Sequence, residues 1–240
     1  MQVRALLCVS LLSATSLAAS AADDINQINL LTQAEFRDLS SDLSAAVSYK
    51  AVVPIEALGI TGFDLGAEVT ATRLAHRSAW DSASSGGAPS TVYIPKIHLH
   101  KGLPAGFDLG AFYATSPDTN INVWGAELRY ALIAGGAATP AVGLRGTYSK
   151  LSGVDQISLN TKGVELGISK GFGFLTPYAG IGRIWTESAP VGPAIATAEK
   201  FADTKTYLGA NINFGLGNVA LEADKIGDTR STSVKLGFRF

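Results

Sequence analysis

Apolar and polar residues alternate with a period of two in ten segments of the chain between residues 61 and 240. This period is typical of β-strands that have one apolar and one polar face. In the first segment, the apolar series Phe63, Leu65, Ala67, Val69 and Ala71 alternates with polar or small residues. The sequence therefore predicts further strands in segments 91–101, 106–115, 120–133, 138–151, 160–171, 174–187, 203–214, 217–227 and 230–240.

One of these segments has an ambiguous pattern. In segment 174–187, Arg183 has the same parity as the apolar residues Ile181 and Trp185, so the pattern alone does not separate an apolar from a polar face.

The connections between the segments alternate between short and long. Short turns occupy 103–106, 135–137, 171–174 and 215–218, whereas the longer connections occupy 75–90, 116–119, 152–157 and 188–202. Transmembrane β-barrels have short periplasmic turns and longer extracellular loops. We therefore expect an antiparallel up-and-down barrel of about ten strands, or alternatively 12, with the long loops at its outer end. Strands of this length and the charges that recur on one face argue against a soluble barrel or sandwich.

The last strand carries the most specific motif of the chain. Apolar side chains at Val234, Leu236, Phe238 and Phe240 alternate with Lys235, Gly237 and Arg239. This pattern resembles the closing strand of bacterial outer-membrane β-barrel proteins, and the resemblance covers residues 61–240. It implies recognition by the barrel-assembly machinery and periplasmic chaperones, and insertion into the lipid of a Gram-negative outer membrane. It does not extend to a characterised subfamily.

The first residues have the features of a secretory signal peptide. Arg4 precedes an apolar region from 5 to 17, and Ala19-Ser20-Ala21 forms a small-residue cleavage site. We expect export by the general secretory route and removal of residues 1–21. Because Cys8 is the only cysteine, the mature chain would have no disulfide, thiol nucleophile or cysteine metal site.

Composition excludes other classes of function. Lys and Arg number 19 and Asp and Glu 20, which gives no basic surface for nucleic acid. The mean hydropathy is +0.22. After the signal peptide, however, no uncharged apolar run is long enough for a helical span. Hydropathy that is spread over alternating segments is typical of a transmembrane barrel.

Residues 22–60 do not alternate, and they predict an amphipathic helix. Thr32 and Glu35 form a capping-box sequence, after which apolar residues recur at helical spacing from Phe36 to Val47. The helix needs a surface that buries this stripe. It could plug the barrel, or pack as a lid or tether at the periplasmic mouth or membrane surface. Alternatively, residues 44–53 could form an additional strand.

The polar faces of the strands predict the lining of the lumen. Buried charges need partners, so they could form an ion-pair network that fills the lumen, or they could line a narrow selective pore. His98 and His100 share a face, but Lys96 beside them opposes a bound cation, so we predict no metal site and no cofactor. The predicted lumen-lining residues are Asp64, Glu68, Lys96, His98, His100, Asp108, Glu127, Arg129, Arg145, Glu165, Glu222, Asp224, Lys235 and Arg239.

These features support two different hypotheses about the function of the protein. The first is a narrow channel or a protein that binds or transports small solutes. The second is a non-conducting barrel with a structural or surface-interaction role. An outer-membrane hydrolase is a weaker alternative, because the outer loops offer His76, Asp81, Asp118 and Asp155 without a recognisable catalytic motif. An acid within hydrogen-bond reach of His76 would favour it.

Overall fold

The computed structural model describes residues 25–84, 88–115 and 121–240, and the predicted signal peptide and Asp118 lie outside them. Ten antiparallel strands form one closed barrel, in which each strand pairs with its neighbours in sequence and β1 pairs with β10. The ten-strand prediction is confirmed, and the alternative of 12 is wrong. The strands are β1 Phe63–Arg73, β2 Thr91–Gly102, β3 Phe107–Thr115, β4 Asn122–Ala134, β5 Ala141–Ser152, β6 Ile157–Ser169, β7 Leu175–Pro190, β8 Glu199–Phe214, β9 Gly217–Ile226 and β10 Thr229–Arg239.

The outside of the barrel is apolar. Burial alternates residue by residue along the strands, so that one face points into the barrel and the other faces outward. On the outward face, Leu65, Ile97 and Leu208 are 53%, 63% and 66% exposed. A closed barrel with an apolar exterior satisfies all its strand hydrogen bonds internally, which is what a lipid environment requires.

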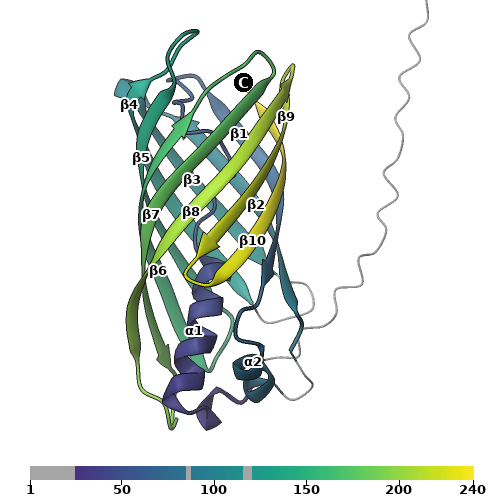
Figure 1. The fold of residues 1–240 in the computed structure, drawn as a ribbon, viewed down its shortest axis with the longest axis vertical. Coiled ribbons are helices and arrows are strands. Elements are labelled where there is room, and N and C mark those ends of the chain that lie inside the picture. Colours follow the sequence, from purple (N-terminus) through teal and green to yellow (C-terminus); the bar gives the residue numbers. More distant parts are fainter. Residues whose placement is uncertain (1–24, 85–87, 116–120) are drawn as a thin grey trace, which may run out of the picture.

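The connections after β2, β4, β6 and β8 lie at one end of the barrel, and the longest connections, 74–90 and 191–198, lie at the other (Figure 1). The predicted separation of short from long connections is not complete, because the two-residue connection 227–228 between β9 and β10 also lies at the end of the long connections. At the short-turn end, Gly135 and Gly173 have φ values of 79° and 65°, a conformation that glycine adopts without strain. We call the two ends the turn end and the loop end.

Helices occur at the loop end (Figure 1). Helix α1 spans Gln33–Val47, and the predicted amphipathic helix is thereby confirmed. Its capping box is formed: the Thr32 hydroxyl accepts from the Glu35 amide, and the Glu35 carboxylate accepts from the Thr32 amide. A second helix, α2 (Arg77–Ala83), lies in the connection from β1 to β2 and was not predicted. Short 3-10 turns span Ile28–Leu30 and Pro104–Gly106. No helix in the described ranges is long and apolar enough to cross a membrane.

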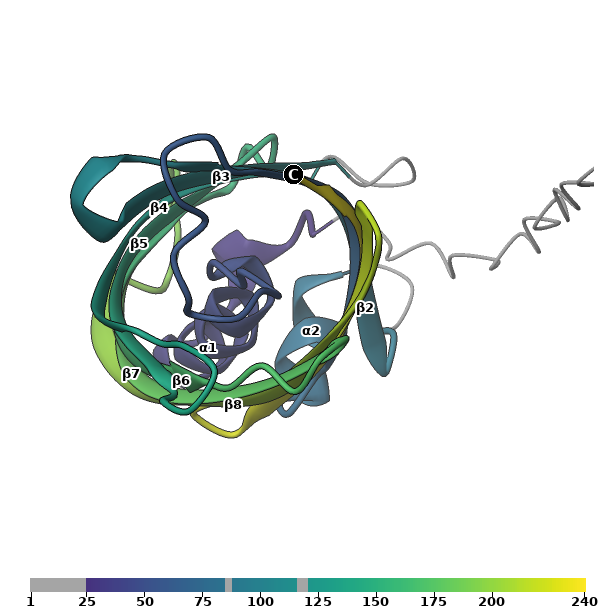
Figure 2. The ribbon, with the colours of Figure 1, turned by 90° about the horizontal axis from the view of Figure 1, so that it is seen from above.

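The segment before β1 runs through the barrel, as the end-on view in Figure 2 shows for α1. It starts at the loop end, where Ile25 bridges to Ser84. It reaches the turn end, where the Leu58 amide donates to Asp108 and Phe63 exchanges backbone hydrogen bonds with Phe240. The alternative of a strand over residues 44–53 is wrong, because 44–47 belong to α1 and 48–53 are irregular. We call residues 25–57 the plug segment.

Candidate functional site

The lumen near the loop end has an apolar side, formed by strands β2 to β6. Their inward residues there include Ile94, Phe112 and Leu159, which are at most 4% exposed. The apolar stripe of α1, which contains Phe36 and Leu43, belongs to the same buried cluster. The barrel interior thus supplies the apolar surface that the amphipathic helix needs.

The adjoining strand β7 presents hydroxyl groups to the helix. Ser40 Oγ donates to Ser188 Oγ at 2.8 Å, and Ser44 Oγ lies 2.6 Å from Thr186 Oγ1, both on β7. All four side chains are buried. The apolar stripe and the serines of α1 therefore contact adjoining parts of the wall, which fixes how the helix is rotated about its axis.

Asp42 attaches α1 to the loop end. This buried carboxylate accepts hydrogen bonds from the backbone amides of Ala75 and His76 at 3.2 and 2.9 Å. It also accepts from Trp80 Nε1 at 3.2 Å and from Thr229 Oγ1 at 2.6 Å. Asp42 therefore connects α1 to the β1–β2 connection and to β10. Trp80 is only 2% exposed.

His76 also contacts this carboxylate. Its Nδ1 lies 3.2 Å from Asp42 Oδ1, and its Nε2 lies 3.8 Å from Asp38. A histidine oriented by a buried aspartate is one part of a general acid–base arrangement. Among the described residues, however, the ring of His76 pairs with two carboxylates, and Asp42 already accepts hydrogen bonds from Trp80 and Thr229. This geometry indicates an anchor for the plug segment.

The predicted lumen-lining residues lie further toward the turn end, and nearly all are buried. Arg239 is the exception, with a side chain that is 20% exposed. The buried residues are Asp64, Glu68, Lys96, His98, His100, Asp108, Glu127, Arg129, Arg145, Glu165, Glu222, Asp224 and Lys235.

Most of these charges pair with other residues of the barrel wall. Lys96 donates to Glu68 at 3.0 Å, and Arg129 donates to Asp108 at 3.0 Å. Asp64 accepts from Lys235 and Arg239 at 2.7 and 2.8 Å. These pairs connect β1 to β2 and β10, and β3 to β4, so they hold the wall together.

Arg145 and Glu165 form the centre of a longer network. Arg145 lies 2.9 Å from Glu127 and 3.0 Å from Glu165. Glu165 also accepts from Lys205 at 2.7 Å. Lys205 was not predicted, although it has the parity of Asn211 and Asn213, the polar face of segment 203–214.

The two predicted histidines stack on each other within the wall. Their rings are 5.8 Å apart, and each faces a carboxylate, His98 facing Glu68 and His100 facing Glu127. In the described part of the chain, no cluster of three or more His, Cys, Asp or Glu side chains suits a metal ion.

The plug segment has few polar contacts with this charged zone. Lys205 donates to the Tyr49 carbonyl at 2.9 Å, and Arg129 donates to the Pro54 carbonyl at 2.8 Å. Lys50 makes the charged contact between the plug segment and this zone. Its Nζ lies 3.4 Å from Asp224 Oδ2, and both side chains are buried. Lys50 was not predicted to take part, because it lies outside the alternating segments.

Aromatic side chains flank the apolar exterior at both ends. Phe172, Phe214 and Phe240 are exposed at the turn end, and Tyr113 and Trp124 toward the loop end. Arg183, whose position was ambiguous, is exposed on the outer face of β7. Tyr178 instead points into the barrel and is 3% exposed, because its parity on β7 is the luminal one.

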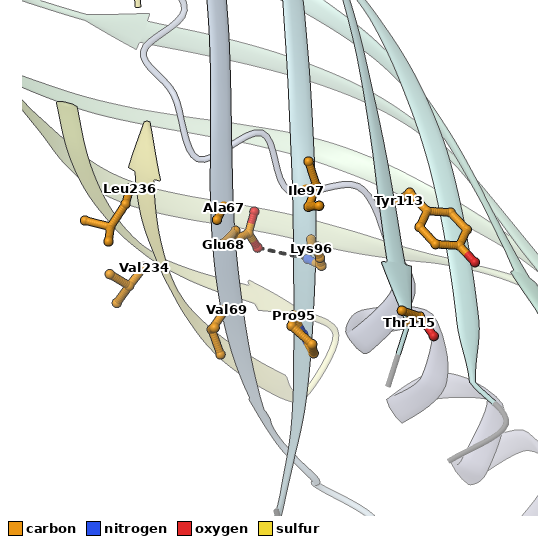
Figure 3. Close-up of a pocket in the computed structure, with 10 residues that line it drawn as sticks. All are labelled: Ala67, Glu68, Val69, Pro95, Lys96, Ile97, Tyr113, Thr115, Val234 and Leu236. Carbon is orange, nitrogen blue, oxygen red and sulfur yellow. Dashed lines mark hydrogen bonds and ion pairs between the residues drawn. The ribbon is translucent and has the colours of Figure 1, made fainter. Parts of the chain in front are cut away.

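A groove of about 530 Å³ lies on the outer wall across β10, β1, β2 and β3. Figure 3 shows Val69, Pro95 and Leu236 along it, while Glu68 and Lys96 pair with each other on the inner face. Its lining is almost entirely apolar, as expected for a wall that faces lipid.

No protein-family model matches the chain, and no curated protein matches it. Among solved structures, the KdgM porin in complex with disordered oligogalacturonate is similar with a TM-score of 0.39 and 9% identity, over 75% of this chain and 99% of that chain. The translocator domain of autotransporter NalP from Neisseria meningitidis gives 0.37 and 13%, over 86% and 97%. OprG from Pseudomonas aeruginosa gives 0.35 and 10%, over 78% and 99%. These distant similarities have no bearing on function.

The class of the protein follows from its own wall. The barrel is closed, most of its exterior is apolar, and a network of buried charges lies inside it. These are the features of a transmembrane β-barrel.

Proposed function

We propose that the protein is a narrow polar channel for small solutes that its own plug segment closes. Residues 22–60 would then form the plug with its connection to β1, and residues 61–240 the pore. Lipid of the outer membrane surrounds the wall, and we expect the assembly machinery and periplasmic chaperones to act during biogenesis.

The observation that carries this proposal is that most ion pairs of the charged wall are made without the plug segment. The ion pairs of Glu68, Asp108 and Glu165 are all made with other wall residues. Removing the plug segment would separate one buried ion pair, Lys50 with Asp224, among the described contacts in this zone. A wall that keeps its partners can become hydrated without leaving many charges unpaired.

The polar contacts between the plug segment and the wall also support the proposal that the plug segment moves. Hydroxyl pairs such as Ser44 with Thr186 can exchange their partner for water at little net cost. The apolar contact between α1 and strands β2 to β6 opposes movement of the plug segment. Breaking this contact would expose side chains such as Phe36 and Leu39 to water. The plug segment is therefore expected to be stably seated at rest.

The second candidate is a permanently closed barrel with a structural or surface-interaction role. It is favoured by the extent of burial along the plug segment, where Phe36, Leu39 and Ala51 are fully buried. In that case, the segment would be an internal core for the barrel.

Single-channel conductance distinguishes the candidates. The mature protein and a variant that lacks residues 22–57 are refolded and inserted into planar bilayers. We expect low or intermittent conductance from the full-length protein and steady conductance from the truncated variant. Cooperative thermal unfolding of the truncated variant would show that its barrel is intact.

Two results would contradict the proposal. An intact truncated barrel without conductance would favour the permanently closed barrel. Steady conductance of the full-length protein equal to that of the truncated variant would show that residues 25–57 do not close the pore.

A further inference from the structure

Three cations lie side by side on the outer face of the barrel near its loop end. Lys225 on β9 pairs in register with Arg230 on β10. Arg230 in turn pairs in register with Arg73 on β1. All three side chains are exposed on the outward face. We call these residues the cationic row.

Like charges that are directly opposite on neighbouring strands destabilise a sheet. In the part of the chain that the structure describes, Arg73 and Arg230 have no ion pair, and Lys225 has a loose one. Its Nζ lies 3.8 Å from Asp228 Oδ1, and the Asp228 side chain is 84% exposed. An anion from outside the chain would offset this repulsion, and Arg and Lys are the side chains that bind phosphate.

A groove adjoins the cationic row. It has a volume of about 380 Å³ and extends over β8, β9 and β10, with Lys225 and Arg230 in its lining. Leu208, Ala223 and Thr232 also line it. Ala223 precedes Lys225 on β9, which runs toward the loop end, so the apolar part lies nearer the membrane centre than the cations.

The row also marks the limit of the apolar exterior. Along β10, the outward residues after Arg230 are Thr232, Val234 and Leu236, and the last two are 45% and 58% exposed. The sequence of groups from the loop end inward is therefore cationic, then apolar. A membrane lipid in the outer leaflet presents its headgroup and acyl chains in the same order.

We propose that the cationic row and its groove bind the phosphate-bearing headgroup of an outer-leaflet lipid, with the acyl chains against Leu208 and Ala223. The row would hold the phosphate by charge-assisted hydrogen bonds, and the groove would accept the first part of a chain. This site is on the lipid face, so it is independent of whether the lumen conducts.

Native mass spectrometry of the full-length mature protein in neutral detergent tests this proposal. The probes are diphosphoryl lipid A, the same lipid after phosphate removal, and inorganic phosphate. The test variant is Arg73→Gln/Lys225→Gln/Arg230→Gln. The matched control is Lys150→Gln/Lys162→Gln/Arg183→Gln, which removes the same charge from exposed positions on β5, β6 and β7.

We expect the wild type to retain diphosphoryl lipid A more tightly than either other probe. The test variant should bind it on the order of 100-fold more weakly, because each basic residue near a membrane surface contributes to attraction of anionic lipid. The control variant should bind as the wild type does. Thermal unfolding of both variants in lipid-free detergent would show that they are folded.

Equal weakening in the two variants would overturn the proposal, because it would indicate general surface charge. Equal binding of the phosphorylated and dephosphorylated lipids would also overturn it, since the phosphate would then not be recognised. Binding of inorganic phosphate as tight as that of the lipid would replace the lipid site with a free-anion site.

Discussion

The Nζ atom of Lys50 lies 3.4 Å from Oδ2 of Asp224, and both side chains are fully buried inside the barrel. Lys50 Nζ also donates to the Ala45 carbonyl at 2.7 Å. The lysine therefore caps the carboxyl end of α1 and neutralises a wall carboxylate at the same time. This contact connects the conformation of the plug segment to the charge of the wall.

Lys50→Met should strongly destabilise the closed protein. Breaking a buried ion pair by removing one partner costs about 3–5 kcal/mol, because the remaining charge stays buried without compensation. Urea unfolding of the refolded protein measures the change. Lys200→Met is the control, since its pair with Glu187 is exposed and should contribute little. Equal effects of the two substitutions would show that the Lys50 contact is not important for stability.

A disulfide between α1 and β7 should hold the plug segment in place. The Ser44 and Thr186 hydroxyl oxygens are 2.6 Å apart, so cysteines at these positions are close enough to be joined. The mature chain is expected to have no other cysteine. Oxidised Ser44→Cys/Thr186→Cys should show no conductance, and reduction should restore the behaviour of the wild type.

The matched control joins two wall strands in the same way. Ser149 Oγ and Thr161 Oγ1 are 2.7 Å apart on β5 and β6. Oxidised Ser149→Cys/Thr161→Cys should leave the conductance unchanged. A loss of conductance in the control as well would mean that any cross-link stops the channel, and the test would no longer support movement of α1.

The lowered pKa of Glu35 predicts that α1 becomes less stable in acid. Hydrogen bonds from the Thr32 side chain and backbone and from Ser82 lower the pKa of this exposed carboxyl below its ordinary value. A carboxyl whose pKa is lower in the folded state than in the unfolded chain stabilises the folded state at pH values above the unfolded-state pKa. This contribution to the free energy of unfolding is lost as the pH falls through the folded-state pKa. The protection factors of the α1 amides in hydrogen exchange, which correct for the intrinsic effect of pH, should therefore fall once the pH is below the ordinary pKa of a glutamate. In Glu35→Gln this acid-dependent loss of protection should be absent, and identical pH profiles of the protection factors would contradict the role of Glu35.

The barrel and the helix could be predicted because their signals are local. Alternation defines each strand, and the capping box at Thr32 and Glu35 defines the start of α1. The positions of Ile94 and Phe112 in the alternation of their strands also indicate that these apolar side chains point inward. They are uncharged, however, and the predicted lumen-lining residues are all charged residues or histidines, so the apolar side of the lumen was not predicted.

The route of the plug segment could not be predicted, because it depends on contacts between residues distant in sequence. Ile28 donates its amide to Gln156, and Gln33 contacts Thr197 and Glu199. These contacts place the start of the segment at the loop end. No local sequence pattern indicates at which end of a barrel an amphipathic helix enters.

This route places the two ends of the described chain at opposite ends of the barrel. Ile25 is beside Ser84 at the loop end, whereas Arg239 is beside Leu216 at the turn end. An epitope inserted directly before Ile25 should therefore bind antibody on intact cells. An epitope in the turn at 215–216 should bind only after the outer membrane is permeabilised. Labelling of the first epitope only after permeabilisation would show that the segment enters from the periplasm.

The charge of the wall predicts which ions pass when the plug segment is absent. Among the buried residues of the described wall, seven are acids and five are Lys or Arg. Arg239 at the turn end reduces this difference but does not remove it. A lumen with excess carboxylates attracts cations, so the variant that lacks residues 22–57 should be cation-selective.

The reversal potential of that variant in a KCl gradient measures this selectivity. Glu165→Gln would leave Lys205 without a carboxylate that it now contacts at 2.7 Å, and should therefore shift the reversal potential toward anions. Glu187→Gln removes the same charge from the exposed outer face and should leave the potential unchanged. Anion selectivity of the truncated variant would mean that the buried wall charges do not control permeation.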